Sequence, residues 1–245
     1  MLRYPLRGSR NLLFPSSLED GQCTAQNFST SNSSCSISTF PVPLRPMTKA
    51  FARFLLSIFG WSVNETIPPE SQRSVMIAAP HTSNWDFILT RIAFYVLGIP
   101  VKIAVKDFWT KLPFGIITVP FGGLGIDRSK KDPNNPRPSQ VQQMANFFDK
   151  YEKIAMVISP EGTRTLRKQW KMGFYHTAKI ANVPITFGYL DFKNKVAGVG
   201  GVIHLTDSVE DDMAKIMDFY RDITPKFPAQ YSTDERYDRA MSNEQ

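Results

Sequence analysis

Apolar runs that suit β-strands alternate with longer stretches of helical periodicity over most of the chain. The apolar runs lie at 75–78, 101–105, 154–158 and 185–190. The stretches with helical character lie at 84–97, 139–151, 173–182 and 209–222. Alternation of this kind predicts an α/β domain with a mixed, largely parallel sheet flanked by helices. In such sheets, ligands gather at the loops that leave the carboxyl ends of the strands.

A further helix is expected before this alternation begins, and it is amphipathic. Its apolar side chains recur at helical spacing, and they are Phe51, Phe54, Leu55, Ile58 and Phe59. The apolar face can pack on the domain core or lie in a membrane interface, and we expect an interfacial helix over 47–61. The chain is not expected to cross a membrane, because no apolar run reaches the ~20 residues that a spanning helix needs. The longest candidate, 87–101, is interrupted by Arg91.

The first 46 residues differ in composition from the rest. The stretch 27–39 is rich in Ser and Thr and cannot bury enough apolar surface to fold. Residues 1–18 contain three arginines and no acidic residue, which is typical of an organelle transit peptide. Alternatively, translation naturally starts at Met47, and residues 1–46 are an added extension of the protein. We expect a disordered extension over 1–46, a folded domain over 47–230 and a C-terminal tail over 231–245.

The basic residues are concentrated in the middle of the chain. Residues 100–175 contain thirteen Lys and Arg against six Asp and Glu, an excess equal to the whole net charge of +7. This excess predicts an anionic partner, such as a phosphorylated substrate or a phospholipid surface, although a solvated basic face has the same pattern. A nucleic-acid partner is not expected, because the basic residues belong to no recognisable nucleic-acid-binding module.

Cysteine and histidine are too few and too scattered for a metal or redox site. Both cysteines, Cys23 and Cys35, lie in the extension, so the domain has no thiol nucleophile and no thiolate ligand. The three histidines, His81, His176 and His204, do not form a metal-ligand spacing. We therefore expect no metal site.

The stretch AAPHTSNWD, residues 78–86, places a histidine five residues before an aspartate. Five residues of regular helix turn through about 500°, so His81 and Asp86 can meet only if the histidine lies in the turn before the helix. An aspartate bonded to one imidazole nitrogen leaves the other free to take a proton. Ser83 to Asp86 also has the S-x-x-D pattern of a helix cap. The two interpretations are compatible, because a carboxylate has two oxygen acceptors.

Two further loops carry glycine and arginine in patterns that suit phosphate binding. One is ISPEGTRTLRKQWK, residues 158–171, in which Gly162 permits close approach of the backbone and Arg164 can bind a phosphate through two hydrogen bonds. A solvated basic loop is the alternative. The other is GGLGIDRSK, residues 122–130, in which Arg128 is a second candidate. Its glycines do not match the G-x-G-x-x-G pattern of a dinucleotide fold.

Taken in order, these motifs resemble those of the glycerophospholipid acyltransferases. The set comprises H-x4-D at 81–86, I-D-R at 126–128, P-E-G-T-R at 160–164 and V-P-I at 183–185. The resemblance covers roughly 47–222, and four ordered motifs are far more specific than any one alone. It is strongest to the 1-acyl-glycerol-3-phosphate acyltransferases of phospholipid synthesis. It implies the glycerol-3-phosphate acyltransferase-like fold.

The resemblance implies a role for each matching residue. His81 would be the general base, and Asp86 would orient it. The acceptor would be bound by Arg128, Glu161, Gly162, Thr163 and Arg164, with the two arginines on its phosphate. Lys106 matches a lysine often seen near the acyl-thioester site, where a role in binding the oxyanion or a cofactor phosphate is a hypothesis. Pro184 would shape the acyl-binding side.

The resemblance also implies a reaction. A fatty acyl chain would pass from acyl-CoA or an acyl carrier protein thioester to the free hydroxyl of a lysophospholipid, 1-acyl-glycerol-3-phosphate. The hydroxyl would attack the thioester directly, without a metal, a bound cofactor or an acyl-enzyme. The enzyme would lie peripherally on the cytoplasmic face of a membrane, or in an organelle if 1–46 is a transit peptide.

Two residues depart from the family pattern, and alternative functions remain open. Pro80 stands where relatives often have Asn, and Gly125 where a bulky residue commonly precedes I-D-R. Both departures bear on the acceptor pocket, so a transferase for another lysolipid or an amino-lipid is one alternative. A thioester hydrolase and a non-catalytic peripheral lipid-binding protein are the others.

Overall fold

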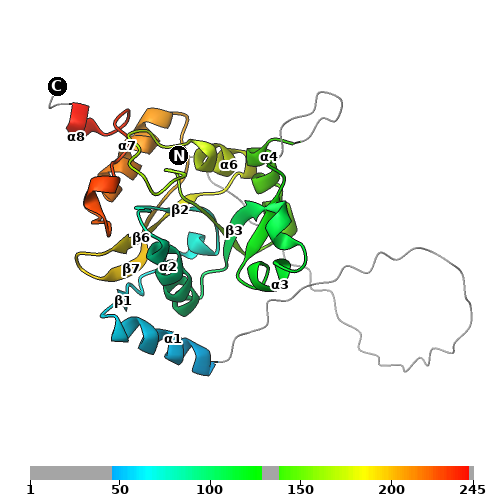
Figure 1. Ribbon diagram of the computed structural model, residues 1–245. Helices are drawn as coiled ribbons and strands as arrows, with labels where there is room; N and C mark the ends of the chain where they lie inside the picture. The colour runs from blue at the N-terminus through cyan, green and yellow to red at the C-terminus, as the bar shows by residue number, and fades with distance from the viewer. Residues whose placement is uncertain (1–45, 129–137, 243–245) are drawn as a thin grey trace, which may run out of the picture. The chain divides into compact units, whose positions relative to one another are not determined.

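The computed structural model describes residues 46–128 and 138–242 (Figure 1). The predicted disordered extension therefore lies outside the described residues, apart from Pro46. Residues 129–130 of the second glycine-containing loop also lie outside them. In the part that is described, the helices are all too short or too polar to cross a bilayer.

Within these residues, seven strands form one sheet in the order β1-β7-β6-β2-β5-β3-β4. Their bounds are β1 Ser62–Val63, β2 Arg73–Ala78, β3 Val101–Lys106, β4 Gly123–Ile126, β5 Ile154–Ile158, β6 Ile185–Asp191 and β7 Val196–Ile203. Neighbouring strands run parallel, except that β6 and β7 are antiparallel. The predicted α/β class with a mixed, largely parallel sheet is therefore confirmed.

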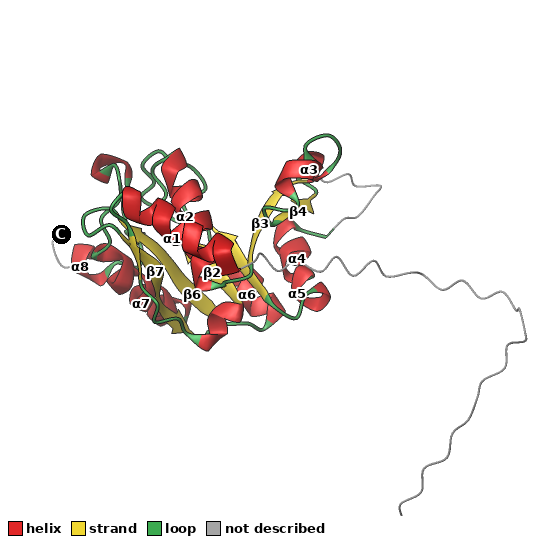
Figure 2. Cartoon of the chain, turned by 90° about the horizontal axis from the view of Figure 1, so that it is seen from below, coloured by secondary structure: helices red, strands yellow, loops and turns green. Residues whose placement is uncertain are grey.

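Helices cover both faces of this sheet (Figures 1 and 2). They are α1 Pro46–Ile58, α2 Asn84–Leu97, α3 Gly115–Thr118, α4 Gln140–Ala145, α5 Phe147–Lys150, α6 Gly173–Ala181, α7 Val209–Arg221 and α8 Arg239–Ser242, with 3-10 turns η1 Pro69–Gln72, η2 Asp107–Thr110 and η3 Pro228–Gln230. α1 packs on α2, which lies against one face of the sheet. α4, α6 and α7 lie against the other face.

Alternation along β2 divides the core between these two faces. Val75 and Ile77 belong to the buried cluster that includes side chains of α6 and α7. Met76, between them, belongs to the cluster that includes side chains of α2. Successive side chains of a strand point to opposite faces, so a strand covered on both sides is apolar throughout. This arrangement explains why the central strands appear in the sequence as continuous apolar runs.

The predicted strands and helices are present, with small shifts at their ends. The four predicted strands correspond to β2, β3, β5 and β6. The predicted helix at 84–97 is α2, and Gly98 ends it at φ +74°, a left-handed conformation that glycine adopts readily. The stretch 139–151 forms two short helices, α4 and α5, which meet at Asn146. The strands that periodicity missed, β1, β4 and β7, are short or rich in glycine.

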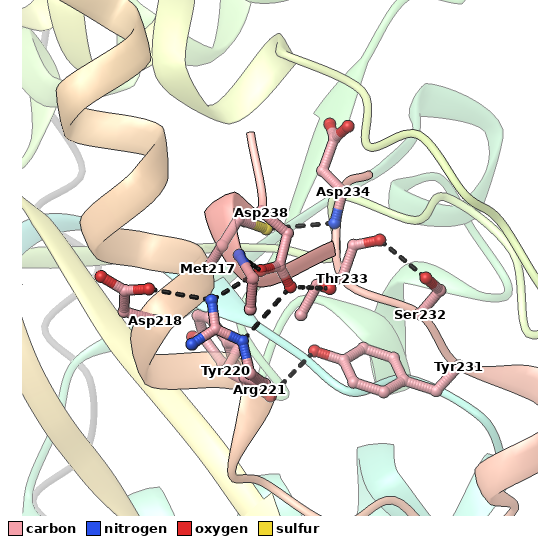
Figure 3. A network of polar contacts seen from close by, with 10 residues as sticks. Met217, Asp218, Tyr220, Arg221, Tyr231, Ser232, Thr233, Asp234 and Asp238 are labelled. Atoms are coloured by element: carbon pink, nitrogen blue, oxygen red, sulfur yellow. Dashed lines mark hydrogen bonds and ion pairs between the residues drawn. The ribbon is translucent and has the colours of Figure 1, made fainter. Parts of the chain in front are cut away.

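Residues 231–238 are packed into the domain, although a tail is expected from 231 onward. Asp234 and Asp238 are fully buried. Asp238 binds the Arg221 guanidinium at 2.6 Å (Figure 3), and Asp234 accepts the Trp170 amide at 2.9 Å. Polar sequence normally indicates exposure, but here buried carboxylates are satisfied by specific donors. Such pairing is set by tertiary structure, so hydropathy could not predict it.

Candidate active site

The turn between β2 and α2 brings His81 and Asp86 together. The Nδ1 atom of His81 lies 3.3 Å from Oδ2 of Asp86. The imidazole side chain is 30% exposed and the carboxylate side chain 5%, so a buried acid holds a histidine that reaches solvent. β2 ends at Ala78 and α2 begins at Asn84, which leaves the histidine in the turn and the aspartate in the first turn of the helix. This is the geometry in which the two side chains can meet.

Asp86 also caps α2. Its Oδ2 accepts the amides of Thr82 and Ser83 at 2.7 Å, and its Oδ1 accepts the Ser83 hydroxyl at 2.6 Å. Burial raises the pKa of the Asp86 carboxyl, but the hydrogen bonds that it accepts, with His81 the first contributor, outweigh burial and hold the pKa below its usual value. The ionised carboxylate can therefore hold the helix end and the imidazole at once.

Glu161, just beyond the carboxyl end of the neighbouring strand β5, supports the same turn. Both of its oxygens lie 3.1 Å from the backbone nitrogen of His81, and Oε2 accepts the Ser159 hydroxyl at 3.1 Å. Burial raises the pKa of the Glu161 carboxyl to about 7, against the opposing effect of the His81 amide. The resemblance implies a contact between Glu161 and the acceptor, whereas here the carboxylate is engaged with the histidine turn.

The loop that follows this carboxylate crosses toward α2. Gly162 has φ +65°, a left-handed conformation that residues with a Cβ rarely adopt, so the sharp turn favours glycine. The Thr163 hydroxyl bonds within the loop. The Arg164 guanidinium donates to the side-chain oxygen of Asn84, the first residue of α2. The predicted phosphate-binding arginine thus lies beside the histidine turn.

A groove of about 440 Å³ lies beside the N-terminus of α2. It is lined by residues 82–85, by Arg164 and Thr165, and by Lys226, Phe227 and Gln230. The Lys226 ammonium lies 5.3 Å from the centre of the Trp85 ring. Neither Arg164 nor Lys226 has a carboxylate of a described residue within ion-pair distance. Two unpaired cations on one groove suit an anionic ligand.

The C-terminal part of the domain ties this groove to the histidine turn. The Phe227 amide donates to the Thr82 hydroxyl at 3.3 Å. With its amide in the orientation that satisfies its neighbours, Gln230 donates to the carbonyls of Thr82 and Arg164 at 3.1 and 2.9 Å. These bonds join the histidine turn to the two segments that carry Arg164 and Lys226.

A second space, a cavity of about 150 Å³, is lined by both His81 and Asp86. α2 contributes Phe87, Arg91 and Phe94 to its wall, and the sheet contributes Ile103, Val157 and Leu190 among others. Most of this wall is apolar. A cavity of about 150 Å³ can hold a molecule the size of benzene, so this one would hold part of an alkyl chain.

Arg91 brings a positive charge into the apolar wall. Its Nη1 lies 3.4 Å from the Val101 carbonyl, and its buried Nε has no hydrogen-bond partner among the described residues. Burial lowers the pKa of the Arg91 guanidinium. A buried donor such as this Nε costs free energy while it has no acceptor, so this part of the wall would accept an oxygen-bearing group better than a methyl group.

The family model described as Acyltransferase matches residues 62–187, more than half of the 245 residues. The chain belongs to the acyltransferase family. The matched region contains all of the predicted site residues. Comparison with curated proteins gave no match. Among solved structures, this acyltransferase is similar to the crystal structure of the 1-acyl-sn-glycerophosphate (LPA) acyltransferase PlsC from Thermotoga maritima, with 13% identity, a TM-score of 0.45, and coverage of 71% of this chain and 76% of that one.

Two of the predicted site residues of this acyltransferase lie apart from the histidine turn. Lys106 ends β3, and Arg128 follows β4 and donates to the Ala104 carbonyl at 3.0 Å. β3 and β4 are the second and third strands from β2, so at about 4.8 Å per strand they lie roughly 10–14 Å from it. The residues that the structure brings together are His81, Asp86, Glu161, Gly162, Thr163 and Arg164.

The departure from the family pattern at Gly125 has a structural reason. A Cβ at Gly125 would lie 2.7 Å from the Thr110 hydroxyl and 2.8 Å from a carboxylate oxygen of Asp107. Glycine in β4 therefore lets η2 pack directly against the strand, and a bulky residue would displace η2. The departure shapes the segment between β3 and β4.

The sequence alone did not identify Lys226 and Gln230 of the groove, or Arg91 of the cavity, as site residues. Lys226 and Gln230 lie in a segment without a motif, and only the return of the chain across the turn brings them to the groove. Arg91 is visible in the sequence as a charge within an apolar run, which is the one signal that could have found it. Among the described residues, His, Cys, Asp and Glu do not gather into a group of three that could hold a metal ion.

Proposed function

We propose that the chain is a 1-acyl-glycerol-3-phosphate acyltransferase. It would move a fatty acyl chain from acyl-CoA or an acyl carrier protein thioester to the free hydroxyl of lysophosphatidate. The observation that carries the proposal is the His81–Asp86 pair, which lies between an apolar cavity and a groove with two unpaired cations. The cavity suits an acyl chain and the groove suits a phosphate, so the two substrates would meet at the imidazole.

His81 would act as a general base. Asp86 holds Nδ1, which leaves Nε2 to accept the proton of the acceptor hydroxyl. As that proton leaves, the hydroxyl oxygen forms a bond to the thioester carbonyl carbon. The carbon–sulfur bond then breaks, and the thiolate takes the proton from the imidazolium. The step needs no acyl-enzyme, which agrees with the position of both cysteines in the first 46 residues.

The remaining charged residues would bind the anionic parts of the two substrates. We assign Arg164 and Lys226 to the acceptor phosphate, because both line one groove and neither has a carboxylate partner among the described residues. Lys106 and Arg128 suit the phosphates of the donor, since they lie together at the ends of β3 and β4. An acceptor role for Arg128 would require its side chain to leave the Ala104 carbonyl.

The exposed face of α1 supports a peripheral position on a membrane. Ala52 and Leu56 are buried, so the helix is attached to the domain through a narrow face. Phe51, Phe54, Ile58 and Phe59 are 56–59% exposed. An apolar helix face of this kind can enter the boundary between headgroups and acyl chains, where a lysophospholipid acceptor resides.

Transfer of radiolabelled oleoyl groups to lysophosphatidate in detergent micelles tests the proposal. Oleoyl-CoA and an oleoyl-acyl carrier protein serve as donors. His81→Ala should lower the transfer rate by about 10³-fold, because it removes the base. His204→Ala is the matched control, since it removes a histidine whose side chain is 72% exposed and which lines neither space.

The same assay distinguishes the proposed function from each alternative. Release of oleate without a lipid product would indicate a thioester hydrolase. Transfer to another lysolipid or an amino-lipid, but not to lysophosphatidate, would change the acceptor class. No turnover with either donor across an acceptor panel, with lipid binding intact, would contradict the enzyme and favour a non-catalytic lipid-binding protein.

A further inference from the structure

The segment between β3 and β4, residues 107–122, carries a concentration of exposed apolar side chains. They are Leu112 (80% exposed), Ile116 (67%), Phe121 (55%), Phe108 (54%), Trp109 (46%), Val119 (46%) and Phe114 (39%). Single exposed apolar residues are normal, but a contiguous group of this size marks a site of interaction. Among the side chains of this segment that the structure describes, which exclude Ile117, none belongs to either buried cluster of the domain.

The segment is ordered by its own contacts. The rings of Phe108 and Trp109 lie 5.3 and 4.9 Å from the ring of Phe114. A Cβ at Gly115 would lie 2.3 Å from the Thr110 carbonyl oxygen, so only glycine permits the tight passage from η2 to α3. The contact of η2 with β4 at Gly125 holds the segment against the sheet. The apolar side chains are therefore presented on a preformed scaffold.

The charges around this aromatic cluster favour a lipid surface. Lys106 and Lys111 flank it, and the acidic Asp107 is paired with Lys111 at 2.7 Å. Aromatic side chains beside lysines are typical of interfacial membrane elements. The rings enter the boundary of the bilayer, and the ammonium group of Lys111, whose side chain is 70% exposed, meets anionic headgroups.

The segment leaves the same edge of the sheet as the histidine turn. β2 and β3 both run parallel to β5, so their last residues, Ala78 and Lys106, lie at one edge. Figure 2 shows α3 next to β3 and β4. A lipid surface in contact with the segment would therefore face the edge at which the cavity of His81 opens.

We propose that residues 107–122 form a second membrane anchor, separate from α1, which inserts into bilayers that contain anionic phospholipids. Two anchors fix the orientation of the domain on the bilayer, whereas a single helix leaves it free to tilt. With both engaged, the carboxyl edge of the sheet lies against the lipid that supplies the acceptor. Binding through this segment does not depend on acyl transfer.

A fluorophore at position 112 tests insertion directly. In the full chain with Cys23→Ser and Cys35→Ser, Leu112→Cys is labelled with the polarity-sensitive dye NBD. Ile180→Cys is the matched control, because Ile180 is 49% exposed on α6. On vesicles of phosphatidylcholine and phosphatidate, the dye at 112 should shift to shorter wavelength and be quenched by brominated acyl chains, and the dye at 180 should not. A dye at 112 that stays in water while the protein binds vesicles would overturn the proposal.

Substitutions measure the contribution of each anchor. Leu112→Ser with Ile116→Ser should weaken vesicle binding by about tenfold or more, since burial of one such side chain is worth about that factor. Phe51→Ser with Phe54→Ser should cause a separate loss, and the two losses should multiply. Ile180→Ser should change nothing. A lipid-free dimer that the Leu112/Ile116 variant converts to a monomer would show that the segment binds a second copy, and would overturn the proposal.

Transfer rates measured on dispersed substrates and on vesicles distinguish the membrane anchor from the proposed acyl transfer. On short-chain substrates dispersed as monomers, the Leu112/Ile116 variant should keep the wild-type rate. On lysophosphatidate in vesicles it should lose about tenfold at limiting lipid. Equal losses in both formats would contradict the anchor. If neither format shows acyl transfer that His81→Ala abolishes, the proposed function is contradicted. The fluorophore measurement would still test the anchor.

Discussion

The histidine turn and the cationic groove beside it are held in opposite ways. The carboxylates of Asp86 and Glu161 accept hydrogen bonds from several donors of the protein. Arg164 and Lys226 have no carboxylate partner among the described residues. Groups that do chemistry must be oriented before the substrate arrives, whereas groups that bind a substrate must keep their charge for it. Under the proposed function, the hydrogen-bonded carboxylates would orient the base, and the two cations without carboxylate partners would bind the phosphate.

Removal of the carboxylate at the turn should have the largest effect. In Asp86→Ala, the amides of Thr82 and Ser83 lose their acceptor, so the free energy of unfolding should fall by about 2–4 kcal/mol. The imidazole also loses its orienting group, so kcat should fall by about 10³-fold or more. Urea unfolding and single-turnover transfer measure the two losses.

The isosteric variant separates the cap from the chemistry. Asp86→Asn keeps one acceptor oxygen for the helix end, so it should lose less stability than Asp86→Ala. It should still lose nearly as much activity, because an amide cannot stabilise the imidazolium. Wild-type turnover in Asp86→Asn would mean that the residue serves only as a cap.

Glu161 should make stability depend on pH. Its carboxyl has a pKa of about 7 in the folded protein against a usual value of 4.5, so between these values the folded state holds more protons than the unfolded state. The free energy of unfolding should therefore fall as pH rises from about 4.5 to above 7, by about 3 kcal/mol in total. Glu161→Gln stays neutral, so its stability should change less over the same range.

Urea unfolding of both proteins between pH 5 and pH 8 checks this expectation. Glu235→Gln is a suitable control, since that carboxylate is 39% exposed and pairs with Lys168. Parallel pH profiles for the wild type and Glu161→Gln would show that Glu161 is already ionised throughout the range.

The smallest effects are expected in the groove, and they should appear in binding alone. Arg164→Ala and Lys226→Ala should each raise KM for lysophosphatidate by about tenfold, because each removes a charge-assisted contact to the phosphate. Stability should change by less than about 0.5 kcal/mol, since both side chains lie at the surface. Steady-state kinetics with lysophosphatidate and with an uncharged monoacylglycerol distinguish a phosphate contact from a general defect.

Arg167→Ala is the matched control for these variants. It removes an exposed arginine from the same loop, but Arg167 does not line the groove. An equal rise in KM for the uncharged acceptor would contradict the assignment of Arg164 and Lys226 to the phosphate.

The sheet and the histidine turn could be predicted from the sequence because their signals are local. Strands covered on both faces give continuous apolar runs, and the five-residue spacing of His81 and Asp86 determines where the helix must begin. The groove could not be predicted in the same way. Lys226 and Gln230 reach it through hydrogen bonds to residues far away in the chain, and a polar sequence carries no record of such pairing.

Glu161 shows the same limit within a motif. The sequence identifies it as a residue that matters, but its contact with the backbone of His81 depends on the adjacency of β2 and β5. The exposed apolar faces of α1 and of residues 107–122 are a further case. Periodicity finds an apolar face on a helix, and only the packed structure tells which side of the helix is covered.

The return of the chain over its candidate active site bears on how the protein is made. Lys226 is synthesised about 145 residues after His81, which at 5–20 residues per second is roughly 7–30 s later. Until then, the Thr82 hydroxyl lacks its bond from the Phe227 amide, and the groove lacks one of its two cations. A nascent chain in which β2 and α2 have already formed therefore still has an incomplete groove. The order of synthesis therefore determines when the groove acquires both of the cations assigned to the lipid phosphate.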